Sequence, residues 1–146
     1  IESGVYQNLI KKQNNEVEIV AEPSPNLAAI IDSADYTDEE VEKAVDLHIG
    51  NMLGAKDLEQ IILGCTHYPI VIDKFQKRAP EINFINPAYE QVLYIKKLMA
   101  EEAIVGDNEK ASFEIYTTGK YSTYDKMIDL LSMKQPDKIS VLDVDF

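Results

Sequence analysis

Apolar residues along this chain switch repeatedly between short compact runs and helical spacing. The runs with the length of strands buried in a parallel sheet are residues 17–21, 60–63, 82–85 and 139–144. Residues 113–117 alternate apolar and polar side chains, which predicts a half-buried strand. Between them lie stretches with apolar residues at steps of three and four. Strands and helices therefore alternate from end to end, which predicts an α/β fold with a largely parallel sheet.

Local signals place the ends of several helices. Ser3 is expected to cap a helix running to about residue 14, and Thr37 with Glu40 has the spacing of a capping box. That second helix carries apolar residues at 41, 45, 49 and 52. Pro69 and Pro87 suit the first residue of a helix, and a last helix is expected over 122–133.

Composition narrows the classes of function. The 146 residues are 45% hydrophobic and 27% charged, with a formal net charge of −12. Such an acidic chain lacks the basic face that a nucleic-acid partner requires. No apolar run approaches the roughly 20 residues that a membrane helix needs, and no signal-peptide pattern opens the chain. A cytoplasmic location is expected. The chain begins with Ile1 and not with Met, and a helix-start signal follows at once at Ser3. We therefore expect the chain to be a segment of a longer polypeptide.

The chain contains one cysteine and two histidines. An internal disulfide is therefore impossible, and a zinc or other metal site is not expected. Cys65 follows the apolar run 60–63 and precedes Pro69, so it is expected at the carboxyl end of a parallel strand, where ligands bind in open α/β sheets. There a helix N-terminus and His67 can stabilise a thiolate. A lone cysteine is more often simply a small buried residue, and composition alone favours that interpretation.

A resemblance to a known family changes that balance. Residues 61–69, Ile-Ile-Leu-Gly-Cys-Thr-His-Tyr-Pro, are similar to the second cysteine motif of glutamate racemases. Residues 1–6, 21–32, 85–90 and 116–119 resemble further segments of that family in the same order, so the resemblance covers essentially the whole chain. The chain is thus similar to the C-terminal half of a member of the aspartate/glutamate racemase superfamily. The fold implied is a three-layer α/β sandwich with a parallel sheet, incomplete in this chain.

The resemblance implies residue roles and a division of the chain. Cys65 and His67 match the catalytic cysteine and its assisting histidine, Thr66 matches a substrate-contacting residue, and Asp32 is the candidate for a substrate-binding carboxylate. Residues 1–72 would form the second racemase lobe. Residues 73–146 would return to complete the first lobe, whose N-terminal part is missing and would be this chain's partner.

The implied activity is interconversion of L- and D-glutamate, supplying D-glutamate for peptidoglycan. One cysteine removes the Cα proton and a second cysteine, absent here, returns a proton on the opposite face. No cofactor is implied, the isolated chain is expected to be inactive, and a homodimer is compatible with the resemblance. Two alternatives stay open: racemisation of aspartate or another amino acid, and a non-catalytic binding domain that keeps the fold.

Overall fold

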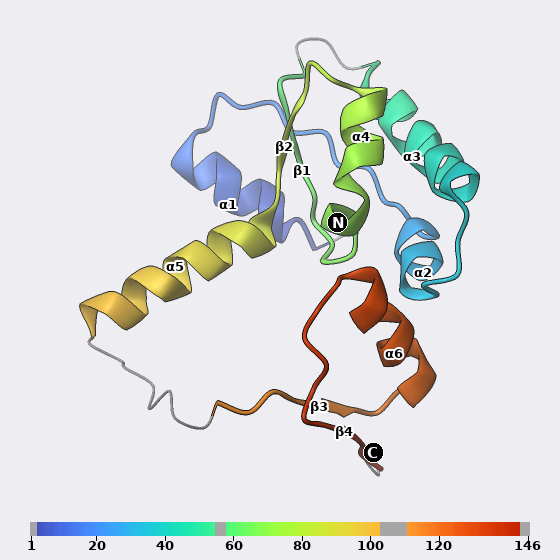
Figure 1. Ribbon diagram of the computed structural model, residues 1–146. Helices are drawn as coiled ribbons and strands as arrows, with labels where there is room; N and C mark the ends of the chain where they lie inside the picture. Colours follow the sequence, from blue (N-terminus) through green and yellow to red (C-terminus); the bar gives the residue numbers. More distant parts are fainter. Residues whose placement is uncertain (1–2, 55–57, 103–110, 144–146) are drawn as a thin grey trace.

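The computed structural model describes residues 3–54, 58–102 and 111–143. Helices and strands alternate along the chain (Figure 1). The helices are α1 (Val5–Gln13), α2 (Leu27–Asp32), α3 (Asp38–Met52), the 3₁₀ turn η1 (Tyr68–Val71), α4 (Ile72–Arg78), α5 (Pro87–Glu101) and α6 (Tyr121–Leu130). The strands are β1 (Gln60–Ile62), β2 (Asn83–Ile85), β3 (Glu114–Thr117) and β4 (Lys138–Val141).

The strands form two parallel pairs. β1 pairs with β2, with Ile61 opposite Phe84, and the Leu63 N–H donates to the Ile85 carbonyl at 3.0 Å, which carries the pairing past the end of β1. β3 pairs with β4, with Ile115 opposite Ile139. In Figure 1, α3 and α4 lie to one side of the β1–β2 pair and α1 to the other. The predicted α/β fold with an incomplete parallel sheet is confirmed.

The core lies among α2, α3, α4 and β1. Val41, Val45 and Ile49 are each at most 1% exposed and recur every four residues, so they form one face of α3. That face packs with Leu27 and Ile31 of α2, both fully buried. Phe75 and Ala79 reach the same core from α4 and its C-terminal cap. The helical spacing over residues 41–52 therefore predicted the buried face of α3 correctly.

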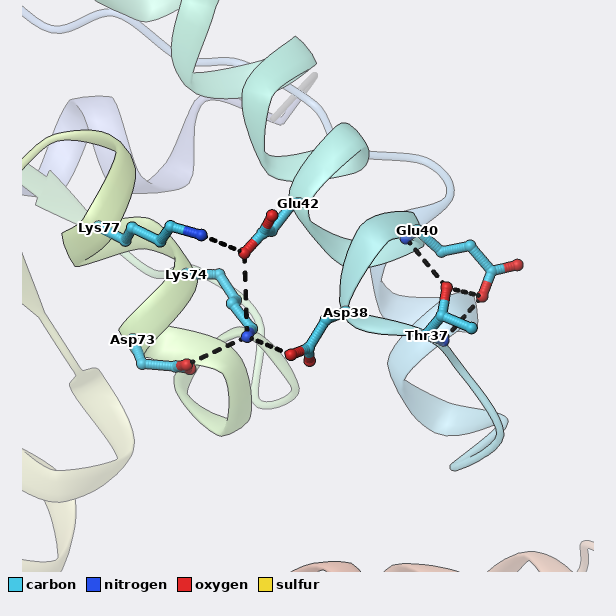
Figure 2. Close-up of polar contacts among 7 residues, drawn as sticks. All are labelled: Thr37, Asp38, Glu40, Glu42, Asp73, Lys74 and Lys77. Atoms are coloured by element: carbon cyan, nitrogen blue, oxygen red, sulfur yellow. Dashed lines mark hydrogen bonds and ion pairs between the residues drawn. The ribbon is translucent and has the colours of Figure 1, made fainter.

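The N-terminus of α3 is fixed by a capping box (Figure 2). The Glu40 N–H donates to Thr37 Oγ1 at 3.3 Å, and the Thr37 N–H donates to Glu40 Oε2 at 2.8 Å. The hydrogen bond from the Thr37 backbone is the main reason that the pKa of Glu40 lies below its ordinary value, and the Thr37 hydroxyl lowers it further. Two backbone N–H groups that would otherwise lack partners at the helix start are satisfied in this way.

Ion pairs join the polar edges of α3 and α4. Lys74 Nζ lies 2.9 Å from Asp38 Oδ2, and Lys77 Nζ lies 2.7 Å from Glu42 Oε1 (Figure 2). The hydrogen bond to Asp38 raises the pKa of Lys74 above its ordinary value. Arg78 Nε pairs with Asp46 Oδ1 at 2.6 Å one turn further along. Ion pairs at the surface each contribute little to the free energy of folding. The core therefore holds the two helices together, and the ion pairs align their polar edges.

Several local expectations differ from the structure. Residues 17–21 form no strand and pair with none of the described strands, and α2 forms where no helix was predicted. The N-cap of α1 is Gly4, not Ser3, and its φ of 63° lies in the left-handed region that glycine adopts at low cost. Pro69 is the second residue, not the first, of the 3₁₀ turn that precedes α4. The last strand ends at Val141, and Val144 lies outside the described residues.

The division at residue 72 stays a prediction. η1 and α4 adjoin each other at this position, and Phe75 and Ala79 on its far side pack with residues 27–63. The helices and strands after Asn86 contribute no member to this core.

The capping box yields a stability prediction. Thr37→Ala should lower the free energy of unfolding by about 1 kcal/mol, because it removes the acceptor of the Glu40 N–H. Folding lowers the pKa of Glu40. The ionised carboxylate therefore stabilises the fold fully at pH values above its ordinary pKa of 4.5, and this stabilisation is lost as the pH falls through the pKa of the folded state. Denaturation at pH values from 7 to 3 should therefore show that Glu40→Gln has a lower free energy of unfolding than wild type at pH 7. The difference between the two proteins should shrink as the pH falls. Glu39→Gln, which removes the same charge from the same helical turn, should show a smaller pH dependence.

The surface of α5 yields a second prediction. None of its residues is buried, and six of its large apolar side chains are 42–60% exposed. They are Tyr89, Val92, Leu93, Tyr94, Ile95 and Met99. Because exposed apolar patches favour association, the isolated chain should self-associate with rising concentration in size-exclusion chromatography with light scattering. Val92→Lys with Ile95→Lys should shift it toward monomer, whereas Gln91→Lys on the same helix should not. A wild-type chain that stays monomeric at millimolar concentration would contradict this.

Candidate active site

Cys65 lies in the turn that joins β1 to the helical segment η1–α4. The Tyr68 N–H donates to the Cys65 carbonyl at 3.3 Å, and the Ile70 N–H donates to the His67 carbonyl at 3.0 Å, so the chain begins to coil directly after the cysteine. The thiol is free and partly buried. The position expected from the sequence, at the carboxyl end of a parallel strand, is confirmed.

Cys65, His67 and Asp32 form a chain of polar contacts. Cys65 Sγ lies 3.7 Å from His67 Nδ1, and His67 Nε2 lies 3.2 Å from Asp32 Oδ1. A carboxylate only accepts, so the Asp32 contact favours the tautomer in which Nε2 carries the proton. Nδ1 then has a free lone pair toward the thiol. His67 is thus arranged to accept the thiol proton while Asp32 stabilises the resulting imidazolium.

Asp32 reaches this position because α2 ends there. It is the last residue of the helix, and its neighbour Ile31 is fully buried in the core, so the end of α2 is anchored. The Asp32 side chain is 59% exposed and that of His67 is 30% exposed, which makes the pair a modest electrostatic contact. Contact between Asp32 and His67 was not expected from the sequence. The expected role of Asp32 in binding substrate stays a prediction.

A cavity of about 510 Å³ opens beside this polar chain. Asp32, Thr66 and His67 line it, whereas Cys65 does not. The opposite wall comes from the start and one face of α6, with Gly119 before it and Leu131 after it. The lining residues on that wall are Gly119, Lys120, Thr123, Tyr124, Met127 and Leu131. The structure therefore brings three of the four predicted site residues, Asp32, Thr66 and His67, to one cavity and places Cys65 against His67.

The α6 wall was missed by reasoning from the sequence. Residues 120, 123, 124, 127 and 131 recur at helical steps and so share a face, but this pattern does not reveal what the face covers. Lys126 Nζ lies 3.3 Å from Asp35 Oδ2, three residues beyond Asp32, and this contact ties α6 to the segment after α2. Lys120 supplies the cationic side chain of the cavity. The cavity therefore offers donors on one wall and the imidazole on the other.

Among the residues that the structure describes, no group of three or more His, Cys, Asp or Glu side chains is close enough to hold a metal ion. No helix in the described ranges is both long and apolar enough to cross a bilayer.

Comparison with known proteins identifies the relatives of this chain. No family model matches it. A glutamate racemase from Lactobacillus acidophilus is 31% identical over 130 residues, which are 87% of this chain and 48% of that protein. A glutamate racemase from Carboxydothermus hydrogenoformans is 25% identical over 145 residues, 99% of this chain and 54% of that protein. The chain is homologous to the C-terminal half of glutamate racemases.

Solved structures share the fold of this chain. A glutamate racemase isoform from Bacillus anthracis matches with a TM-score of 0.83 at 21% identity, over 98% of this chain and 53% of that one. The glutamate racemase from Francisella tularensis, solved in complex with D-glutamate, matches with a TM-score of 0.83 at 20% identity, over 97% of this chain and 53% of that one. At this identity the likeness establishes the fold. The chain spans about half the length of the glutamate racemases that it matches.

The polar chain yields a prediction on thiol reactivity. Asp32→Asn should slow alkylation of Cys65 by iodoacetamide at pH 7 by about twofold to fivefold, because a partly exposed charge pair is worth about 0.5–1 kcal/mol. The rate is measured by mass spectrometry of the folded protein. Asp35→Asn, three residues away and paired with Lys126, is the matched control and should leave the rate unchanged. Equal rates for wild type and Asp32→Asn would show that the carboxylate does not act on the thiol through His67.

Proposed function

We propose that this chain is part of an amino-acid racemase and supplies one of the two groups that move a proton at the substrate Cα. The observation that carries the proposal is the contact chain from Cys65 through His67 to Asp32, at a strand end in a fold shared with glutamate racemases. His67 takes the thiol proton, and the thiolate can then remove a Cα proton. Asp32 holds the imidazole in the required tautomer.

The reaction balances only with a second acid on the other face of the substrate. Removing the Cα proton leaves a planar carbanion, and protonation from the same face would regenerate the starting enantiomer. The chain has one cysteine. We infer that the second proton donor comes from the half of the protein that the relatives have and this chain does not span, and that this half closes the substrate cleft. The isolated chain would then be inactive as a racemase.

Glutamate is the proposed substrate. An anionic amino acid suits the cavity beside Thr66, where Lys120 is available to a carboxylate. Cys65 does not line this cavity, but its Sγ lies 3.7 Å from Nδ1 of His67, which does. The curated relatives are named glutamate racemases, and one solved relative was captured with D-glutamate. The proposal extends to a cofactor-independent mechanism, to supply of D-glutamate for peptidoglycan in the cytoplasm, and to a homodimeric whole protein. Racemisation of L- and D-glutamate, with aspartate assayed in parallel, tests it directly.

Replacing Cys65 tests whether two different groups transfer the proton on the two faces of the substrate Cα. In the full-length protein, Cys65→Ser should reduce racemisation in both directions by about 10²–10⁴, the range contributed by a general acid or base, because every turnover uses both groups. Exchange of the Cα proton with deuterated solvent should survive for the enantiomer that the other group deprotonates. Following each enantiomer separately by NMR in deuterated water distinguishes the two faces.

His67→Ala should also reduce racemisation while Cα-proton exchange survives for one enantiomer, but the reduction should be smaller than in Cys65→Ser. The reason is that the imidazole assists Cys65 and does not replace it. Asp35→Asn serves again as the control that leaves the contact chain intact. Racemisation by Cys65→Ser at the wild-type rate would remove Cys65 from the mechanism.

A further inference from the structure

The cavity beside His67 is proposed to admit an anionic amino acid, although the protein around it is acidic. The chain has a net charge of −12. Asp32 lines the cavity with its side chain 59% exposed, and the side chain of Asp35, three residues further along, is 82% exposed. Negative charge at a surface lowers the local concentration of anions. Capture of glutamate therefore requires a cation at the cavity that offsets these aspartates.

Lys120 is the one lysine or arginine among the described residues that line this cavity. Its side chain is exposed, and it forms no ion pair with any residue in the ranges 3–54, 58–102 and 111–143. The other charged side chains beside it have partners, because Asp32 contacts His67 at 3.2 Å and Lys126 contacts Asp35 at 3.3 Å. The charge of Lys120 is therefore the one that is available to a ligand.

The backbone of Lys120 is held in place by the turn between β3 and α6. Thr117, the last residue of β3, is 5% exposed, and its Oγ1 accepts a hydrogen bond from the Gly119 N–H at 2.8 Å. A Cβ at Gly119 would lie 3.3 Å from the same Oγ1, so the turn leaves little room for a side chain there. The Thr123 N–H donates to the Lys120 carbonyl at 3.2 Å. A fixed backbone thus presents a flexible, charged side chain to the cavity.

An exposed lysine acts on the capture of a ligand more than on the chemistry that follows. Its field extends about 8 Å at physiological ionic strength, and it raises the rate at which oppositely charged ligands arrive. In the proposed reaction the Cα proton is moved by other groups, which are Cys65 with His67 and the donor on the opposite face. Loss of the Lys120 charge should therefore raise KM more than it lowers kcat.

We propose that Lys120 is a specificity-determining residue, which selects ligands of net negative charge, such as dicarboxylic amino acids, for the cavity beside His67. The identity of the substrate rests on the proposed racemase function. The selection by charge does not, because it can be measured at Cys65 without turnover.

Racemisation by the full-length protein gives the first test. Lys120→Gln should lower kcat/KM for D-glutamate by about twofold to fivefold, mostly through KM, because exposed ion pairs have effects of this size. The deficit should shrink as the ionic strength rises from about 0.01 M to about 1 M, since the screening length falls from about 30 Å to about 3 Å. Lys120→Arg keeps the charge and should restore the wild-type value. Lys134→Gln removes the same charge from an exposed position outside the cavity lining and should have no effect.

Alkylation of Cys65 in the same proteins tests the selection by charge without racemisation. The thiolate attacks the same carbon of iodoacetate and of iodoacetamide and displaces iodide from both, but only iodoacetate is an anion. Because both reagents meet the same thiolate, the ratio of their rates cancels any change in the fraction of thiolate. Lys120→Gln should lower the ratio of the iodoacetate rate to the iodoacetamide rate by about twofold at low ionic strength, and Lys134→Gln should leave it unchanged.

The two measurements separate this inference from the proposed function. A rate ratio that Lys120→Gln leaves unchanged overturns the inference, whether or not the protein racemises glutamate. A deficit in kcat/KM that is equal at low and high ionic strength overturns it too, because it would indicate a structural role for the side chain. A lowered rate ratio in a protein that racemises no glutamate would instead contradict the proposed function and support the selection by charge.

Discussion

The packing of Phe75 is the contact on which the site depends most. Its ring, 5% exposed, lies 5.7 Å from that of Phe84 on β2 and 6.1 Å from that of Tyr68, three residues after the catalytic cysteine candidate. One side chain of α4 thus joins the strand pair to the turn that carries Cys65. Aromatic pairs at these spacings add to the free energy of burial, and close packing transmits any displacement of the ring to its neighbours. The position of the thiol is therefore set by the core as well as by the turn.

The parts of the fold that were predicted correctly are those governed by local interactions. The capping box at Thr37 and Glu40 involves residues three apart, and the buried face of α3 follows from a spacing of four. Residues 17–21 have a strand composition, but a strand exists only where another strand provides a ladder, and none of the described strands pairs with them. α2 was not predicted, although Ala28 and Ala29 within it have a high intrinsic preference for helix.

The distinction between local and tertiary interactions also applies to the candidate site. Cys65 and His67 are two residues apart, so the sequence places them together on one turn. Asp32 reaches His67 across 35 residues, and α6 lines the cavity from beyond residue 119; such contacts depend on tertiary packing that no local pattern encodes. The sequence thus predicts which residue is the candidate reactive group, and the structure shows what surrounds it.

The chain has a net charge of −12, and its proposed ligand is an anionic amino acid. Part of the acidic excess is neutralised locally where Asp38, Glu42 and Asp46 pair with basic residues of α4. Among the residues that line the site cavity, Asp32 is the acidic one and lies against His67, while Lys120 is the basic one. Because salt screens charges beyond about 8 Å, these neighbours outweigh the distant surface. The local field at the cavity is therefore compatible with a carboxylate ligand, and the overall acidity opposes nucleic acid without opposing glutamate.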